Sequence, residues 1–298
     1  MTNVVALINR QGGAASRDPD IRATVAEALD QAGIGAVIEV IGGSEFAERC
    51  RALAQRGDPI VIVGGGDGTM AAAASALAGT KTALALLPLG TLNHFARDLG
   101  IPVELDEAAA VIANGEVRDV DIGEMNGRVF INNSAIGLYP LMVIDRELQR
   151  SRLGRSKKLA MVLASIRTLA RFGHRRLTLT VNDERQGRVE TPLLFVGNND
   201  YRIDIGAPGR RESLDDGRLC VLVMRKKTRR GLIAASLRAL FDRSRPDDLV
   251  RIDDVEKLRV DSHRSRLAVS LDGEVAHPEP PLDYRIRPGA LRVVLPPR

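Results

Sequence analysis

Residues 61–69 read VIVGGGDGT, a buried-strand pattern that runs into a glycine turn carrying one carboxylate and one hydroxyl. Glycines let backbone N–H groups approach an anion because no Cβ obstructs them, and they adopt positive φ where a turn needs it. The alanine-rich segment after Thr69 predicts a helix, whose N-terminus adds about half a positive charge. Gly65, Gly66 and Gly68 are therefore predicted to cradle phosphate.

The carboxylate in this turn belongs to Asp67. An isolated carboxylate repels phosphate, so its presence indicates a bridging divalent cation, with Mg²⁺ as the oxygen-seeking candidate. The alternative is an ordinary glycine-rich strand-to-helix turn with a solvated Asp67. The combination of three glycines with Asp, Gly and Thr favours the phosphate site.

Polar residues also follow three other predicted strands. Asn9 ends the first strand, and Thr91 and Asn93 lie in a loop after the strand at 83–87, where they can hydrogen-bond a nucleotide phosphate or sugar. Near the C-terminus, Asp272 and Glu274 flank a glycine after another strand. One of these two carboxylates can take a proton from a hydroxyl while the other serves metal or ribose.

The elements that must position these residues alternate over the first 120 residues. This β-α order predicts a parallel sheet with helices on both faces, and such sheets bind ligands at the carboxyl ends of their strands. The predicted strands are 4–8, 36–40, 60–63 and 83–87, and the predicted helices are 21–32, 45–55, a segment after Thr69, 94–99 and 105–113.

From residue 118 onward the pattern changes to strands joined by turns, including an Asn126-Gly127 hairpin tip. The predicted strands are 117–123, 128–135, 177–181, 188–196, 219–224, 258–260, 267–271 and 291–295, interrupted by helices at 157–172 and 231–241. The fold class is thus α/β plus mainly β. An α/β domain over 1–122 precedes a β-sandwich over 123–287.

The chain has 298 residues, enough for two packed cores, and a net charge of +5 that is unevenly distributed. Residues 1–144 carry 10 Lys and Arg against 17 Asp and Glu, whereas residues 145–298 carry 33 against 21, concentrated at 145–176 and 225–230. Such a basic half suits an acidic membrane surface, phosphorylated substrates or nucleic acid, or is merely a solvated face. The chain has only nine aromatic residues, which disfavours nucleic acid because few rings are available to stack on bases.

The segment 157–172 has the composition of a basic amphipathic helix, which either lies on anionic lipid or packs on its own domain. The opening apolar run is too short for a signal sequence, and no apolar stretch approaches the roughly 20 residues of a spanning helix. We therefore expect a cytoplasmic protein that associates peripherally with membranes. The oligomeric state stays open, with a homodimer among the alternatives.

Four motifs, in this order and spacing, resemble the diacylglycerol kinase catalytic-domain family of lipid kinases, which includes sphingosine kinases and soluble bacterial lipid kinases. They are IN…G at 8–13, GGDGT at 65–69, PLGTLNHFAR…GIP at 88–102 and LDGE at 271–274. The segment IGAP…LDDGRL at 205–219 also resembles the region around the family's Asp-Gly turn. The resemblance covers essentially the whole chain.

This resemblance implies an ATP-dependent kinase with nucleotide between the two domains and residues 288–298 returning to the first. It implies that Asp67 reaches a catalytic Mg²⁺ and that Asn9, Thr69, Thr91 and Asn93 position the nucleotide. It makes Asp272 the prime candidate to deprotonate a lipid hydroxyl, gives Glu274 a contact to nucleotide or metal, and assigns a structural Mg²⁺ to Asp216 and, less securely, Asp215.

The chain departs from the family pattern at three places. Met70 and alanines stand where Asn-Glu is usual, His94 replaces an Asp, and Arg10 replaces a Pro. Two rival functions follow. A soluble-substrate kinase of the NAD kinase type shares the Gly-Gly-Asp-Gly-Thr turn, and a nucleotide-binding, membrane-associated module without catalysis would explain the departures.

Overall fold

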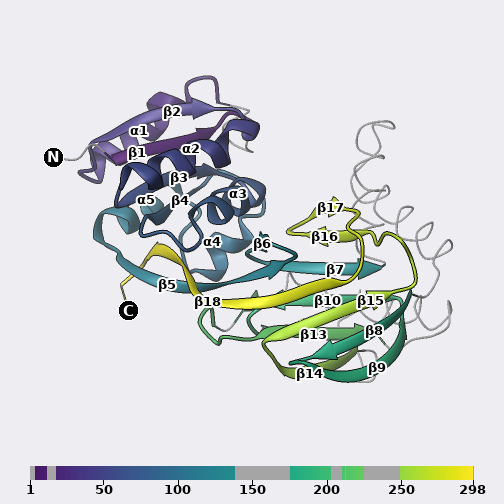
Figure 1. The fold of residues 1–298 in the computed structure, drawn as a ribbon. Helices are drawn as coiled ribbons and strands as arrows, with labels where there is room; N and C mark the ends of the chain where they lie inside the picture. Colours follow the sequence, from purple (N-terminus) through teal and green to yellow (C-terminus); the bar gives the residue numbers. More distant parts are fainter. Residues whose placement is uncertain are drawn as a thin grey trace, which may run out of the picture. The chain divides into compact units, whose positions relative to one another are not determined.

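The structure is a computed structural model that describes residues 4–11, 18–137, 175–202, 210–211, 213–224 and 249–297 (Figure 1). It divides into two compact units, Met1–Ile122 with Arg287–Arg298, and Gly123–Ile286. The helices predicted at 157–172 and 231–241 lie outside the described residues, as do the basic cluster at 225–230 and nearly all of the one at 145–176.

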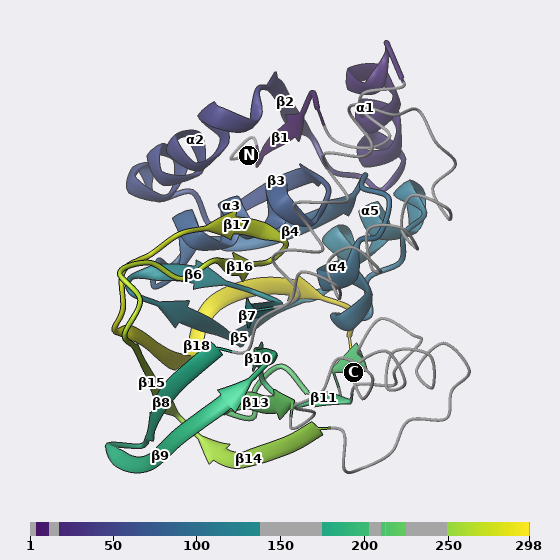
Figure 2. The same ribbon diagram turned by 90° about the vertical axis from the view of Figure 1, so that its right-hand side faces the viewer.

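The first unit is built on a parallel sheet, which confirms the predicted α/β class. The strand order is β2-β1-β3-β4, and β18 is the next neighbour, joined in parallel through the pair Leu84 and Val293. Helices α1 and α5 cover one face and α2 and α3 the other (Figure 2). The bounds are β1 Val4–Asn9, α1 Ile21–Gln31, β2 Ala36–Ile41, α2 Gly43–Arg56, β3 Ile60–Gly65, α3 Asp67–Leu77, β4 Ala83–Pro88, α4 His94–Asp98, α5 Leu105–Asn114 and β18 Leu282–Leu295.

Burial explains why these segments adopt this arrangement. The central strands β1, β3 and β4 are apolar and almost fully buried along their length, as a parallel sheet covered on both faces requires. Helix α1 buries Ile21, Val25, Ala28 and Leu29, which recur at helical spacing and so form one stripe. The hydrophobic pattern therefore fixes both the strands and the helix faces.

Helix α3 begins earlier than predicted. Gly66 is its N-cap, with an extended backbone at φ −95° and ψ −174°, and Asp67 is already helical. Asp67 and Gly68 thus lie in the first turn of the helix instead of in the loop before it. A carboxylate is stabilised there by the partial positive charge of the helix N-terminus.

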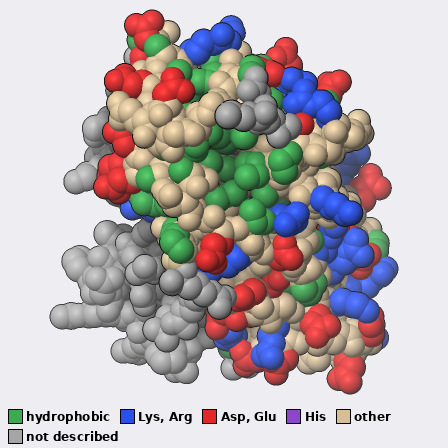
Figure 3. Space-filling model, turned by 90° about the vertical axis from the view of Figure 1, so that its left-hand side faces the viewer, with side chains coloured by type: hydrophobic (Ala, Val, Ile, Leu, Met, Phe, Trp, Pro, Cys, Tyr) green, Lys and Arg blue, Asp and Glu red, His purple; other side chains and the backbone are tan. Residues whose placement is uncertain are grey.

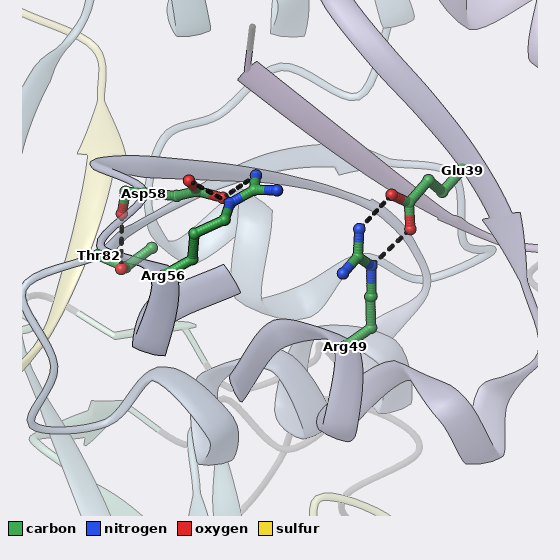
Figure 4. A network of polar contacts seen from close by, with 5 residues as sticks. All are labelled: Glu39, Arg49, Arg56, Asp58 and Thr82. Atoms are coloured by element: carbon green, nitrogen blue, oxygen red, sulfur yellow. Dashed lines mark hydrogen bonds and ion pairs between the residues drawn. The ribbon is translucent and has the colours of Figure 1, made fainter. Parts of the chain in front are cut away.

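Two arginines of α2, Arg49 and Arg56, form ion pairs with carboxylates (Figure 4). Arg49 donates to both oxygens of Glu39 on β2, at 2.7 and 2.5 Å, and this pairing lowers the pKa of the Glu39 carboxyl. Arg56 pairs with the carboxylate of Asp58, just before β3. The backbone carbonyl of Asp58 accepts a hydrogen bond from the Thr82 hydroxyl at 2.7 Å.

Apolar side chains gather on the surface of the first unit seen in Figure 3.

The second unit is a β-sandwich, as predicted. One sheet contains β15, β8 and β9 with residues 282–286 of β18 and the β5–β6 hairpin, and the other has the order β14-β13-β10-β7-β16-β17. Apolar side chains from both sheets form one core between them. The bounds are β5 Glu116–Met125, β6 Arg128–Phe130, β7 Asn133–Gly137, β8 Arg175–Val181, β9 Glu184–Thr191, β10 Leu193–Asn198, β11 Tyr201–Arg202, β12 Arg210–Arg211, β13 Leu219–Met224, β14 Leu249–Val255, β15 Lys257–Ser262, β16 Val269–Leu271 and β17 Glu274–Ala276.

Two strands predicted as continuous are interrupted, and both predictions were wrong for a physical reason. The segment 128–135 splits into β6 and β7 because the backbone N–H groups of residues 131–133 turn toward the Asp272 carboxylate. The segment 188–196 splits into β9 and β10 at Pro192, which has no N–H to donate to a ladder. The hairpin tip at Asn126 and Gly127 is confirmed, with φ of 47° and 79°.

Strand β18 takes part in both units. Its first residues pair with β15 in the second unit, while Arg287 onward belongs to the first unit, where Val293 pairs with Leu84 of β4. None of the helices in the described ranges has the length and apolarity needed to cross a bilayer.

Candidate functional site

The glycine turn of β3 and α3 approaches the loop after β4 closely, with the backbones of Gly66 and Gly90 side by side. A Cβ placed on Gly90 would lie 2.5 Å from the Cα of Gly66 and 2.5 Å from Oδ1 of Asn93. A Cβ on Gly65 would lie 2.6 Å from the side chain of Thr69. None of residues 64–68 has a positive φ, so glycine is required at Gly65, Gly66 and Gly90 for close approach and not for a left-handed backbone.

Asp67 joins the same two loops through its side chain. Its Oδ1 accepts a hydrogen bond from the backbone N–H of Phe95 at 3.2 Å, so the first turn of α3 is tied to the start of α4. In the described part of the chain no group of three or more His, Cys, Asp or Glu side chains is placed to hold a metal ion. Mg²⁺ bound here would have the Asp67 carboxylate as its protein ligand, and oxygens of phosphate and water as its other ligands. Mg²⁺ is commonly bound in this way in proteins. The residues present fit that ion.

Asn9, at the carboxyl end of β1, contacts Thr69 in the first turn of α3. Asn9 Nδ2 donates to Thr69 Oγ1 at 2.8 Å, and Asn9 Oδ1 accepts from the backbone N–H of Gln11 at 3.0 Å. A Cβ on Gly43, the first residue of α2, would lie 3.7 Å from Asn9 Nδ2. The amide of Asn9 therefore lies beside the first turns of both α2 and α3.

Asn93 shapes its own loop. It has a left-handed backbone, with φ 52°, and its side chain is buried. Oδ1 accepts from the N–H of Gly90 at 2.9 Å, while Nδ2 donates to the carbonyls of Gly90 at 3.0 Å and Pro88 at 3.2 Å. Thr91 is exposed and His94 is half-buried at the start of α4. A nucleotide contact by Thr91 or Asn93 stays a prediction.

Asp272 lies in the turn between β16 and β17 of the second unit and binds three successive backbone N–H groups. Ile131 donates to Oδ2 at 2.8 Å, and Asn132 and Asn133 donate to Oδ1 at 2.8 and 3.1 Å. The backbone N–H of Asp272 in turn donates to the carbonyl of Asn133 at 2.8 Å. Asp272 therefore anchors the break between β6 and β7, a structural role that its sequence neighbourhood does not signal.

Burial raises the pKa of the Asp272 carboxyl to about 6, although the three N–H groups and the positive charge of Arg211 act in the opposite direction. A carboxylate with this pKa is largely ionised at neutral pH and is matched to proton abstraction from a hydroxyl. Glu274, two residues on, is exposed at the start of β17. The two carboxylates of this turn thus lie in contrasting environments.

The raised pKa of Asp272 predicts a pH dependence of folding stability. The folded chain holds this proton more tightly than the unfolded chain, so the contribution is complete below about pH 4 and is lost as the pH rises through about 6, with an upper limit of about 3 kcal/mol. We expect the unfolding free energy of the wild type relative to Asp272→Ala to fall between pH 4.5 and 6.5 in urea titrations. An exposed control, Asp30→Ala, should show no such change, and a flat difference for Asp272→Ala would contradict the assignment.

The structure gives Asp215 and Asp216 different surroundings. Asp215 Oδ1 accepts from Ser213 Oγ at 2.5 Å, so one of its oxygens is engaged within its own turn. Asp216 lines a cavity of about 310 Å³, together with Arg251, which pairs with Asp200 at 2.6 Å. A structural ion at Asp216 stays a prediction.

Met70 and the alanines after it stand where the family usually has Asn-Glu. Met70 is 3% exposed on α3, Ala71 and Ala72 are half-buried, and Ala73 and Ala74 are fully buried. This stretch directly after the glycine turn therefore carries no polar side chain.

Two protein-family models match this chain, one over its first part and one over its second part. Residues 3–125 match the family model of the diacylglycerol kinase catalytic domain, and residues 142–295 match that of the YegS C-terminal NAD kinase beta sandwich-like domain. The two matches together span nearly all of the chain.

Proteins that are similar to this chain over most of its length are named as lipid kinases. A protein of Pseudomonas aeruginosa PAO1 named "Probable lipid kinase YegS-like" is 30% identical over 301 residues, covering 95% of this chain and 92% of its own. A diacylglycerol kinase of Bacillus subtilis strain 168 is 28% identical, covering 72% and 71%.

The fold has close counterparts among solved structures. A crystal structure from Bacillus anthracis str. Sterne matches with a TM-score of 0.77 at 25% identity, covering 99% of this chain and 97% of that one. Another from the same organism, a diacylglycerol kinase, matches with 0.70 at 21% identity over the same shares and supports the fold alone. With its glycine turn, its sandwich and both domain matches in place, the chain belongs to the diacylglycerol kinase and YegS-like family of lipid kinases.

Proposed function

We propose that this chain transfers the γ-phosphoryl group of ATP to a hydroxyl of a lipid at an anionic membrane surface. The observation that carries the proposal is the junction of the two loops in the first unit. Gly66 and Gly90 pack backbone to backbone, and Asp67 bridges from the first turn of α3 to the N–H of Phe95. Such a junction presents helix N-terminal N–H groups and one carboxylate to the same small volume, which suits a polyphosphate with its cation.

Within this unit each predicted residue has a proposed task. The backbone of Gly65, Gly66 and Gly68 binds phosphate oxygens at the N-terminus of α3. Asn9 and Thr69, already joined by a 2.8 Å hydrogen bond, orient the nucleotide, and the exposed Thr91 contributes from the neighbouring loop. Mg²⁺ held by Asp67 would neutralise phosphate charge, since phosphoryl transfer depends mainly on positioning and charge neutralisation.

The second unit is proposed to supply the base. Asp272 remains the first candidate because its pKa of about 6 suits proton abstraction, while its three N–H donors keep its position fixed. Glu274 is exposed on β17 and is proposed to contact nucleotide or metal. The basic residues at 145–176 and 225–230 are proposed to draw a cytoplasmic protein to anionic lipid.

The substrate class can be tested directly. Purified full-length protein is incubated with labelled ATP, Mg²⁺ and mixed vesicles that contain diacylglycerol, a sphingoid base, ceramide and phosphatidylglycerol. We expect label in one lipid, and the absence of labelled lipid from all four would refute the proposal. Label transferred to NAD would instead support the soluble-substrate alternative, and ATP binding by calorimetry without any product would support a non-catalytic module.

The two carboxylates of the β16–β17 turn can be separated kinetically. If Asp272 is the base, kcat/KM of the wild type falls about tenfold per pH unit below about pH 6, because the base must be ionised. Asp272→Ala then nearly abolishes turnover, whereas Glu274→Gln retains the acid limb. Loss of that limb in Glu274→Gln, with full retention of turnover in Asp272→Ala, would move the base to Glu274.

A further inference from the structure

A buried guanidinium lies against the turn that binds Asp272. Arg211 on β12 is 5% exposed and donates from Nη1 to the carbonyl of Ile131 at 2.6 Å and from Nη2 to Oδ1 of Asn132 at 3.1 Å. Its guanidinium carbon lies 5.5 Å from the ring centroid of Tyr201. A buried arginine keeps its positive charge. Its planar guanidinium therefore needs hydrogen-bond acceptors nearby, and here these are the Ile131 carbonyl and the Asn132 side chain.

One peptide group connects this cation to the carboxylate. The carbonyl of Ile131 accepts from Arg211, and the N–H of the same peptide, which belongs to Asn132, donates to Asp272 Oδ1 at 2.8 Å. A hydrogen bond at one end of a peptide polarises it and strengthens the bond at the other end. Asn198 Nδ2 also donates to the Ile131 carbonyl, at 3.0 Å. The peptide is therefore held from both sides in the orientation that Asp272 needs.

We propose that Arg211 is a positioning residue that orients the Ile131–Asn132 peptide, and through it the carboxylate of Asp272, for the phosphoryl-transfer reaction. This inference rests on the proposed function. It adds a residue that lies within the 205–219 segment but between its IGAP and LDDGRL parts, where Arg211 is one basic residue among many in the second half.

A purely structural arginine and a positioning arginine differ in what their loss changes. A structural loss lowers the amount of folded protein and leaves turnover per folded molecule unchanged. A positioning loss lowers kcat and leaves the KM for ATP unchanged, because the nucleotide residues Asn9, Asp67 and Thr69 belong to the first unit. Lysine keeps the charge but cannot reproduce the two-pronged fork, so Arg211→Lys should restore only part of the loss.

The test compares Arg211→Met, Arg211→Lys, Asn132→Ala and the double variant Arg211→Met with Asn132→Ala. Arg259→Met serves as matched control, since Arg259 lies on β15 of the same unit and is exposed. Two quantities are measured on the full chain: kcat and KM for ATP with the lipid that the wild type phosphorylates, and hydrogen exchange of the amides of residues 131–133 without substrate.

We expect Arg211→Met to lower kcat about 10- to 100-fold with KM for ATP within about twofold, and to speed exchange of the three amides at least about tenfold. Arg211→Lys should lie between Arg211→Met and the wild type, and the double variant should be little worse than Arg211→Met because both changes remove the hydrogen bond from Arg211 Nη2 to Asn132 Oδ1. Arg259→Met should match the wild type in both measurements.

Wild-type kcat and exchange in Arg211→Met would overturn the proposal, as would a loss of folded protein with unchanged kcat per folded molecule. If Arg211→Met does not fold, Arg211→Lys and Asn132→Ala decide by the same two measurements. If the wild type phosphorylates no lipid, the proposed function fails separately, and the positioning of Asp272 is then judged from amide exchange alone.

Discussion

Replacing Asp67 with alanine is expected to lower kcat roughly 10³-fold, the scale seen when a preorganised charge is removed from a reacting centre. Two effects combine. The change removes the carboxylate proposed to hold Mg²⁺, and it breaks the 3.2 Å hydrogen bond from Phe95 that ties the two loops together. Steady-state kinetics with the identified lipid measures the loss, and urea unfolding measures any change in stability.

Asp67→Asn separates the two effects because the amide oxygen can still accept from the Phe95 N–H while the charge is lost. We expect this variant to fold like the wild type and to be almost as inactive as Asp67→Ala. Asp30→Ala, an exposed change on α1, should leave kcat unaltered. Near-normal turnover in Asp67→Asn would show that the charge is not needed and would remove the proposed metal ligand.

The second large effect is expected from Gly90→Ala. The added Cβ would lie 2.5 Å from the Cα of Gly66 and 2.5 Å from Oδ1 of Asn93, so the two loops must separate. Overpacking of this kind costs about 1–3 kcal/mol of stability. A displacement of about 1 Å at a reacting centre costs on the order of 10²-fold in rate. Urea unfolding and calorimetry with Mg²⁺ and ATP should show lower stability and a weakened affinity.

Gly35→Ala is the matched control for this change. A Cβ on Gly35 meets no heavy atom within 4 Å and its φ is not positive, so stability should change by no more than about 0.5 kcal/mol. If Gly90→Ala binds ATP like the wild type, then close contact of the two loops is not what forms the phosphate site.

The local pattern of apolar and polar residues was sufficient to predict most of the helices and strands. Buried apolar runs and helical spacing determine β1, β3, β4 and α1 because burial depends on the residues themselves and their immediate neighbours. The interruption of the predicted strand at 128–135 could not be predicted from neighbouring residues. It depends on Asp272, which is about 140 residues away in sequence.

The residues of the candidate site also differ in whether the local sequence indicates them. Asn9, Asp67 and Thr69 were predictable because glycine turns and strand ends carry local signals, and the structure places Asn9 against Thr69. The internal hydrogen bonds of Asn93 and the buried position of Arg211 were not predictable, since both depend on tertiary packing that the neighbouring residues in the sequence do not indicate.

The sharing of β18 between the units has a consequence for biosynthesis. Leu291, Val293, Val294 and Leu295 are buried in the first unit, yet they are synthesised only after the whole of the second unit. The first unit therefore cannot complete its sheet until β18 has been synthesised, and a nascent chain stalled at residue 280 should leave the edge of β4 open. Removing residues 287–298 would damage the first unit more than the second.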